Sequence, residues 1–179
     1  GGRCGLNIVT GWNRPEYAQM GMWPGDDHYQ RRYDYAAEYV EILQTLWQSG
    51  RANWEGEYFK LDDCSVLPTP ANPIPLVCAG QSPAGRAFVA KHADHQFVLT
   101  GEGNLVRSVE DIRAKSAVSG RNVGVYALFH MILADTDEMA QAEVRQIIEL
   151  ADQGAISNIL ASASLDTNTG GTADQLKAA

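Results

Sequence analysis

Near its N-terminus the chain reads GLNIVTGW over residues 5–12, and the polar and aromatic run NRPEY follows over residues 13–17. Leu6, Ile8 and Val9 are the apolar side chains of a buried strand, which stops at a glycine. Polar side chains that crowd the end of such a strand are typical of the C-terminal end of a barrel strand, where active sites are built. The stretch therefore predicts a strand that delivers its end to a binding site.

Composition places the chain among ordinary globular proteins. Its length of 179 residues is enough for one domain with a hydrophobic core. The chain is 45% hydrophobic and 20% charged, as is usual for a globular protein. The net charge of -8 argues against a nucleic-acid or anionic-membrane surface, because both favour a cationic protein face. No apolar run approaches the roughly 20 residues that a membrane-spanning helix needs.

The cysteines predict neither a disulfide framework nor a metal site. Cys4, Cys64 and Cys78 are odd in number and widely spaced, without a C-x-x-C pair. This pattern is typical of reduced thiols in a cytoplasmic protein, which is the location that we expect.

Strand and helix signals alternate along the chain. Apolar runs predict three further strands, over residues 74–79, 94–100 and 123–133. Apolar residues spaced three and four apart predict helices over residues 27–48, 83–92, 105–118 and 135–150, with a weaker helical patch near 156–160. Residues 13–25 are predicted to form a loop, and residues 52–73 an extended excursion or hairpin.

This alternation predicts a parallel α/β architecture. A doubly wound sheet and a barrel both fit the alternation by itself. Four strand–helix units make half of an eight-fold barrel, which usually takes about 250 residues. Because the chain opens and ends in mid-pattern, we expect a fragment of a barrel rather than a complete small sheet. We also expect the isolated chain to be inactive and prone to aggregation through its sheet edges.

Several motifs resemble the bacterial luciferase-like flavin monooxygenases. They read GRCGLNIVTGW at 2–12, PEY at 15–17, GDD at 25–27, RRY at 31–33, DDC at 62–64 and CAGQS at 78–82. Within this family the chain most resembles the pyrimidine oxygenases that open the uracil ring. The resemblance implies a (β/α)8 TIM barrel of the luciferase-like type. The chain would hold about strands 4 to 7 as part of a single domain.

The resemblance also implies an activity and its partners. Such enzymes are monooxygenases that use molecular oxygen and reduced FMN, which a separate NAD(P)H-dependent flavin reductase supplies. The implied substrate is a small N-heterocycle, in particular uracil. Other substrates such as sulfonates or halogenated aromatics stay open, as do a non-catalytic flavin-binding protein and a phosphate-binding module without flavin. We expect the full-length protein to be a homo-oligomer.

The family pattern implies flavin contacts at Asn7, Glu16, Arg32, Tyr33, Gly80, Gln81 and Ser82. Asn7 interrupts an apolar strand and is the catalytic candidate, implied to contact the flavin or the oxygen bound to it. Arg32 is implied to bind the FMN phosphate, because arginine recognises phosphate in a planar, bidentate geometry. Without the resemblance, Glu16 would be a solvated loop carboxylate, and Arg31 with Arg32 a solvated helix face.

Ser82 has the strongest case from the residues alone. It follows a predicted buried strand and precedes Pro83, and a serine N-cap with proline at the next position starts a helix. The free N–H groups at such a helix start attract an anion. A cap with no further role is the alternative interpretation.

One stretch departs from the family pattern. Pyrimidine oxygenases carry a glycine-rich stretch with a lysine after the sixth strand, whereas residues 97–104 read FVLTGEGN. Glu102 stands in or near the place of that lysine, so the charge near the expected mouth of the barrel is reversed. His130 lies within the strand predicted over 123–133 and would face either the substrate or the core.

Overall fold

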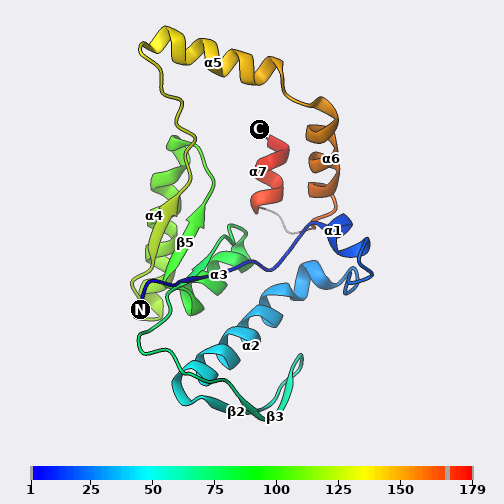
Figure 1. The fold of residues 1–179 in the computed structure, drawn as a ribbon, viewed down its shortest axis with the longest axis vertical. Coiled ribbons are helices and arrows are strands. Elements are labelled where there is room, and N and C mark those ends of the chain that lie inside the picture. The colour runs from blue at the N-terminus through cyan, green and yellow to red at the C-terminus, as the bar shows by residue number, and fades with distance from the viewer. Residues whose placement is uncertain (1, 168–169, 179) are drawn as a thin grey trace.

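The computed structural model describes residues 2–167 and 170–178. Its centre is a parallel four-stranded sheet with helices on one face, and a separate two-stranded hairpin lies beside the long helix (Figure 1). The strands of the parallel sheet are β1 (Leu6–Ile8), β4 (Leu76–Cys78), β5 (His95–Val98) and β6 (Gly124–Ala127).

The four strands pair in the order in which they occur along the chain, and every pair is parallel. One register line runs through Ile8, Cys78, Gln96 and Val125. A doubly wound sheet reverses its strand order at the switch point, whereas neighbouring barrel strands keep one order. The described strands show no reversal, and this favours the barrel-type arrangement over the doubly wound one.

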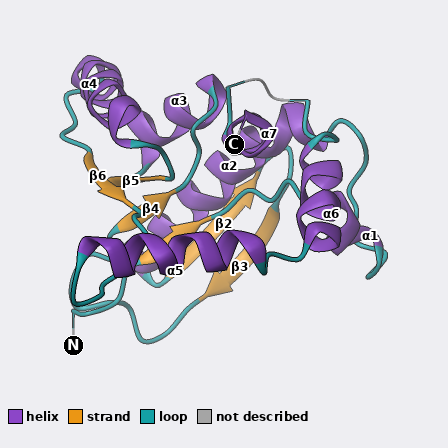
Figure 2. Ribbon diagram, turned by 90° about the horizontal axis from the view of Figure 1, so that it is seen from above, coloured by secondary structure: helices purple, strands orange, loops and turns teal. Residues whose placement is uncertain are grey.

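Three helices cover one face of the sheet: α2 (His28–Ser49), α3 (Pro83–His92) and α4 (Glu102–Val118) (Figure 2). The core between them and the strands includes Ile8, Ala36, Val40, Leu76, Cys78, Phe88, Val89, Ile112 and Val123. Ala36 and Val40 stand four apart on the buried face of α2, as the helical spacing predicts. Gly50 ends this helix with a φ of 72°, a left-handed conformation that glycine adopts without a Cβ clash.

The range predicted as an excursion contains an antiparallel hairpin, made of β2 (Arg51–Glu55) and β3 (Lys60–Ser65). The hairpin packs on the C-terminal half of α2 and forms a second small core there. Its members are Ile42, Leu46, Ala52, Trp54, Phe59, Leu61 and Cys64. Because this core is separate from the sheet, the hairpin leaves the order of the parallel strands unchanged.

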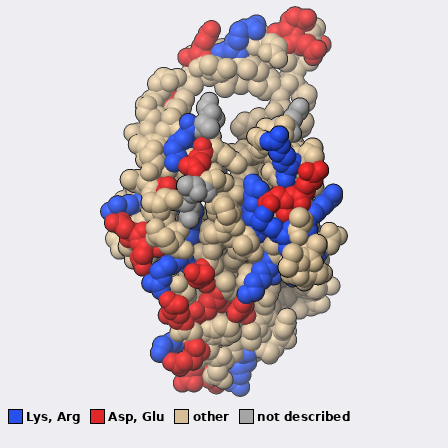
Figure 3. All heavy atoms as spheres, turned by 180° about the vertical axis from the view of Figure 1, so that it is seen from behind, with Lys and Arg blue, Asp and Glu red and all other residues tan. Residues whose placement is uncertain are grey.

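The C-terminal part is helical and consists of α5 (Asp137–Glu149), α6 (Gln153–Ala163) and α7 (Thr172–Ala178). Figure 1 shows α5 at one end of the molecule, apart from the sheet, and it buries none of its residues. No helix in the described ranges is long and apolar enough to cross a membrane. On the face shown in Figure 3, cationic and anionic side chains are interspersed.

The predicted strand over 123–133 is too long, because β6 ends at Ala127. The backbone N–H of Leu128 still donates to the Val98 carbonyl, over 3.0 Å, but β5 ends there and offers no further partner. The following apolar residues are therefore not part of the sheet, and Leu133 is 84% exposed. His130 consequently lies on an exposed segment beyond the strand.

Other boundaries differ in smaller ways. The predicted loop 13–25 contains a short helix, α1 (Arg14–Ala18), with Pro15 in its first turn. Helix α4 begins at Glu102, three residues before its predicted start at 105, and the Glu102 side chain lies outside the part that the structure describes. The patch 156–160 extends into α6, and α7 has no counterpart among the predicted helices.

Candidate functional site

A cavity of about 130 Å³ lies where β1 and β4 end, beside the first turns of α2. Its lining contains most of the predicted site residues, namely Arg32, Tyr33, Gly80, Gln81 and Ser82. Residues 8–12 form another side, and the C-terminal tail contributes Asp166, Gly171 and Ala173. Four segments that are distant in sequence therefore meet at one small site.

Arg32 provides the buried positive charge of this cavity. Its side chain is only 6% exposed, whereas the neighbouring Arg31 lies at the surface. Arg32 Nη1 donates to the Gly11 carbonyl over 2.9 Å, and Nη2 donates to the Asp166 carboxylate over 3.0 Å. Among the described residues Nε has no hydrogen-bond partner, although it is buried. The guanidinium therefore keeps unused donor capacity beside the cavity.

The first turn of α2 also holds the loop that follows β1. His28 Nε2 lies 3.2 Å from the Gly11 carbonyl oxygen, and the Tyr29 hydroxyl donates to the Trp12 carbonyl over 3.2 Å. Burial, and then the nearby Asp166 carboxylate, raise the pKa of Tyr29 above its ordinary value. Tyr29 thus remains a neutral donor at neutral pH and fixes the loop that lines the cavity.

The connection between β4 and α3 has no room for a side chain at Gly80. A Cβ at this position would lie 2.8 Å from Gly85 Cα and 2.9 Å from the Tyr33 hydroxyl oxygen. The two backbones and the tyrosine are therefore in direct contact. Gln96 supports this connection from the helix side, because its Nε2 donates to the Gly80 carbonyl over 2.8 Å.

Ser82 caps α3 as predicted. Its hydroxyl accepts a hydrogen bond from the Gly85 N–H over 3.2 Å, and Pro83 occupies the first turn. The Ser82 side chain is buried and lines the cavity, so the start of this ten-residue helix faces the same space as Arg32. Such a helix start favours anions through its free N–H groups.

Gln81 joins the cavity to the C-terminal tail. Its Nε2 donates to Gln175 Oε1 on α7 over 3.0 Å. The Gln81 carbonyl accepts from Arg86 Nε over 2.8 Å, which fixes the backbone beside the cavity. Polar contacts through Gln81 and through Arg32 thus hold the tail at the cavity.

Two predicted residues lie apart from the other five. Asn7 is exposed on β1, and side-chain alternation directs it to the sheet face opposite to its buried neighbour Ile8. Glu16 is exposed on α1, where its carboxylate accepts a hydrogen bond from Asn13 Nδ2. Neither residue lines the cavity, so their roles stay predictions.

The open sheet face that carries Asn7 also carries an aromatic pair. His95 pairs in register with Val77, which itself pairs with Asn7. The His95 ring stacks on Tyr126 with centroids 4.5 Å apart and planes at 9°. His130, in contrast, is exposed and is not among the residues that line the cavity.

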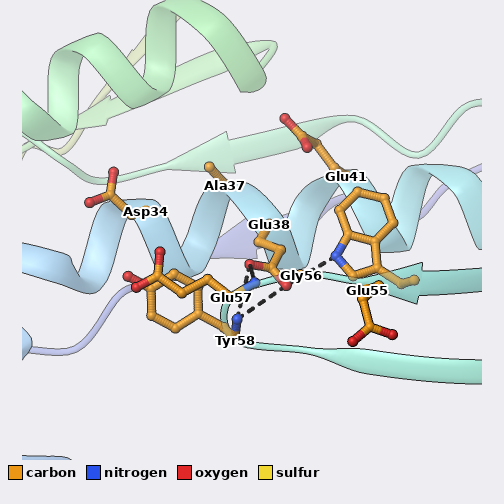
Figure 4. Close-up of a pocket in the computed structure, with 9 residues that line it drawn as sticks. Asp34, Ala37, Glu38, Glu41, Glu55, Gly56, Glu57 and Tyr58 are labelled. Carbon is orange, nitrogen blue, oxygen red and sulfur yellow. Dashed lines mark hydrogen bonds between the residues drawn. The ribbon is translucent and has the colours of Figure 1, made fainter.

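A second, larger cavity of about 330 Å³ lies between α2 and the hairpin, and its lining is acidic (Figure 4). The carboxylates that line it are those of Asp34, Glu38, Glu41, Glu55 and Glu57. In the described part of the chain, no group of three or more His, Cys, Asp and Glu side chains is placed to hold a metal ion.

Glu38 gives this acidic cavity a structural role. Its carboxylate accepts hydrogen bonds from Trp54 Nε1 over 3.0 Å and from the Phe59 N–H over 2.8 Å. It also accepts one from the Tyr58 N–H over 3.1 Å (Figure 4). Desolvation raises the pKa of Glu38, but these hydrogen bonds outweigh it and hold the pKa below its usual value. The carboxylate anchors the tip of the hairpin to α2.

Sequence reasoning missed Asp166, whose carboxylate is the charged partner of Arg32. It lies 134 residues further along the chain, in a tail rich in serine, asparagine and threonine. Nothing in the spacing of the tail marks this aspartate. It could have been found only by asking which anion accompanies a buried arginine.

Comparison with known proteins decides the family. The model of the luciferase-like monooxygenases matches residues 1–178. The chain belongs to this family. The pyrimidine monooxygenase RutA of Cronobacter sakazakii is 45% identical over 95% of the chain, and RutA of Escherichia coli is 44% identical over a similar share. These matches cover 51% and 48% of the two relatives, so the chain spans about half the length of the curated relatives that it matches.

Solved structures of other proteins have a similar fold. A riboflavin lyase, crystallised with modified FMN and riboflavin, superposes with a TM-score of 0.77 at 25% identity over 90% of the chain and 42% of its own. A long-chain alkane monooxygenase gives a TM-score of 0.73 at 24% identity, over 93% and 44%. The parallel sheet and its helices are therefore those of the luciferase-like α/β fold.

Proposed function

We propose that the protein is a monooxygenase that uses reduced FMN and molecular oxygen to oxidise a pyrimidine ring such as uracil. The observation that carries the proposal is the 44–45% identity to pyrimidine monooxygenases over 95% of this chain. Family membership supports the reaction class, because every match considered above lies within the luciferase-like monooxygenases or shares their fold. The substrate rests on the RutA relatives alone.

The cavity beside α2 fits the phosphate end of FMN. Arg32 offers a guanidinium with a buried, unused N–H, and the start of α3 at Ser82 favours an anion. Gly80 lets the β4–α3 connection pack directly against the backbone of Gly85, and this close contact fixes the start of α3 beside the cavity. Tyr33 and Gln81 would complete the polar lining. When bound, the reduced flavin would supply the electrons that oxygen chemistry needs, and this chain would bind and orient it.

Asn7 and Glu16 would contact the flavin outside this cavity. We assign Asn7 to a hydrogen bond with the flavin or its bound oxygen, because its amide has both donors and an acceptor and stands exposed on the open sheet face. Glu16 would contact the flavin from the loop region after the strand. Both assignments depend on the family pattern.

The four parallel strands would be about strands 4 to 7 of a (β/α)8 barrel. Their sequential order and common direction support this assignment, as does the length of the relatives, which is about twice that of the chain. A separate NAD(P)H-dependent reductase would supply the reduced flavin. A homo-oligomer remains our prediction for the whole protein.

The test is uracil consumption by the protein, purified as its gene encodes it, with FMN, NADH, a flavin reductase and air. We expect oxygen-dependent loss of uracil, which chromatography measures. No uracil should be lost when oxygen or the reductase is omitted. Turnover of a sulfonate or a chlorinated aromatic without turnover of uracil would overturn the pyrimidine assignment. Flavin binding without any oxygen-dependent product would indicate a non-catalytic flavin-binding protein.

A further inference from the structure

Asp166 and Gly11 together fix the direction of the Arg32 guanidinium. The Asp166 carboxylate accepts a hydrogen bond from Arg32 Nη2 over 3.0 Å, and the Gly11 carbonyl accepts one from Nη1 over 2.9 Å. Both charged side chains are almost fully buried, at 6% exposure for Arg32 and 4% for Asp166. A planar guanidinium recognises phosphate only in a suitable orientation, so two acceptors from separate segments determine where its remaining N–H groups point.

The same ion pair sets the charge of the cavity. A carboxylate beside a phosphate repels it, and a cation that pairs with the carboxylate and binds the phosphate offsets this repulsion. Arg32 and Asp166 together contribute no net charge, so binding of an anion depends on directed donors. These donors are the unused N–H groups of Arg32 and the start of α3 at Ser82.

We propose that Asp166 is a positioning residue of the flavin site, which holds the Arg32 guanidinium in the orientation that meets the flavin phosphate. This inference rests on the proposed function, because it takes the phosphate monoester of FMN as the anion. Asp166 lies in the tail between α6 and α7, and Gln175 on α7 contacts Gln81. The tail thus acts on the phosphate end of the cofactor through a residue that need not touch it.

The experiment compares FMN with riboflavin, which has the same ring and ribityl chain but no phosphate. Dissociation constants of both ligands are measured by flavin fluorescence titration for the protein purified as its gene encodes it and for its Asp166→Ala and Asp166→Asn variants. We expect Asp166→Ala to weaken FMN binding by about tenfold or more and to leave riboflavin binding unchanged. Asp166→Asn keeps an oxygen that accepts from Arg32, so its loss of FMN affinity should be smaller.

Two further variants separate positioning from general structure. Asp174→Ala is a matched control on the same tail, because Asp174 pairs with Lys177 and accepts from the Gly170 N–H. It should leave the ratio of FMN to riboflavin affinity unchanged. The double variant Arg32→Ala/Asp166→Ala should bind FMN no more weakly than Arg32→Ala, because Asp166 acts through Arg32.

Several outcomes would overturn the inference. Equal weakening of FMN and riboflavin by Asp166→Ala would mean that Asp166 only stabilises the tail. Unchanged FMN binding by this variant would mean that Arg32 is positioned without Asp166. Tighter FMN binding would mean that Asp166 competes with the phosphate for Arg32. If circular dichroism shows that Asp166→Ala does not fold, the same comparison on Asp166→Asn decides. If the unmodified protein, purified as its gene encodes it, binds neither flavin, the proposed function fails before any variant is made, and this inference fails with it.

Discussion

Helix α2 borders two cavities whose polar groups are arranged in opposite ways. The cavity at its first turns contains a buried arginine with an unused N–H, a helix start and a glycine that packs against the backbone of that helix. The cavity beside the hairpin is larger and carries five carboxylates, yet one of them, Glu38, already accepts hydrogen bonds from four donors of the hairpin, including Trp54 Nε1.

The difference teaches how a binding site can be told from a structural anchor. By volume alone, the acidic cavity, at about 330 Å³, would be a better candidate for a binding site than the other cavity, at about 130 Å³. Unused donors favour the smaller one, because a buried polar group without a partner is costly and gains most from a ligand. Glu38 has already made its hydrogen bonds within the protein, so it stabilises the hairpin rather than a ligand.

The largest effect should come from the arginine itself. Arg32→Ala should weaken FMN binding and lower the free energy of unfolding by about 3–5 kcal/mol, because it removes the counter-ion of the buried Asp166. Urea unfolding and FMN titration measure the two effects. Arg31→Ala is the control. Arg31 forms exposed contacts, namely ion pairs with Asp27 and Glu57 and a hydrogen bond to the Tyr58 hydroxyl, so its loss should change both quantities little. Similar losses in the two variants would contradict the special role of Arg32.

A smaller effect is expected where the backbone is closely packed. Gly80→Ala should lower the free energy of unfolding by about 1–3 kcal/mol and weaken FMN binding, because its Cβ would meet the backbone of Gly85. Gly103→Ala, at an open position in α4, should cost no stability, and thermal unfolding compares the two variants directly. If the two variants melt alike, the close contact at Gly80 is not important.

The helix caps give a third comparison. Ser82→Ala and Thr136→Ala each remove a side-chain cap, of α3 and α5 respectively, at a cost of about 1 kcal/mol. Only Ser82→Ala should also weaken FMN binding, as measured by titration. A loss of FMN affinity in Thr136→Ala as well would show that the effect follows stability rather than the site.

The smallest effect concerns the acidic cavity and appears mainly at low pH. Because the folded pKa of Glu38 is lowered, Glu38 adds stability above the ordinary carboxyl pKa of about 4.3, and that stability is lost as the pH falls through the lowered value. Glu38→Gln should therefore lose less stability than the unmodified protein between neutral and acidic pH. It should speed amide exchange at Tyr58 and Phe59 and leave FMN affinity unchanged. Altered FMN affinity would link the two cavities.

Local elements of the fold could be predicted well. Apolar spacing located α2 to within one residue at each end, and the Ser82–Pro83 pair placed the start of α3 correctly. Both signals depend on neighbouring residues only. The strand over 123–133 was predicted too long, because the apolar run continues past the point at which β5 stops offering hydrogen-bond partners.

The candidate site could be predicted only in part from the sequence. The family pattern named Arg32, Gly80 and Ser82, and the structure brings these three residues to one cavity. The pattern could not show that Asn7 lies on another face, because residue type does not reveal which side of a strand faces which layer.

What the sequence determined by itself is the alternation of strands and helices, the cap of α3 and the membership of a family, all of which are written in short stretches of residues. What only the tertiary structure decided is which charges meet. Arg32 and Asp166 are 134 residues apart in the sequence, and Glu38 accepts hydrogen bonds from the hairpin tip about twenty residues further along. Such pairs depend on how the chain closes on itself, because burial makes each charge require a partner without specifying where in the sequence that partner lies.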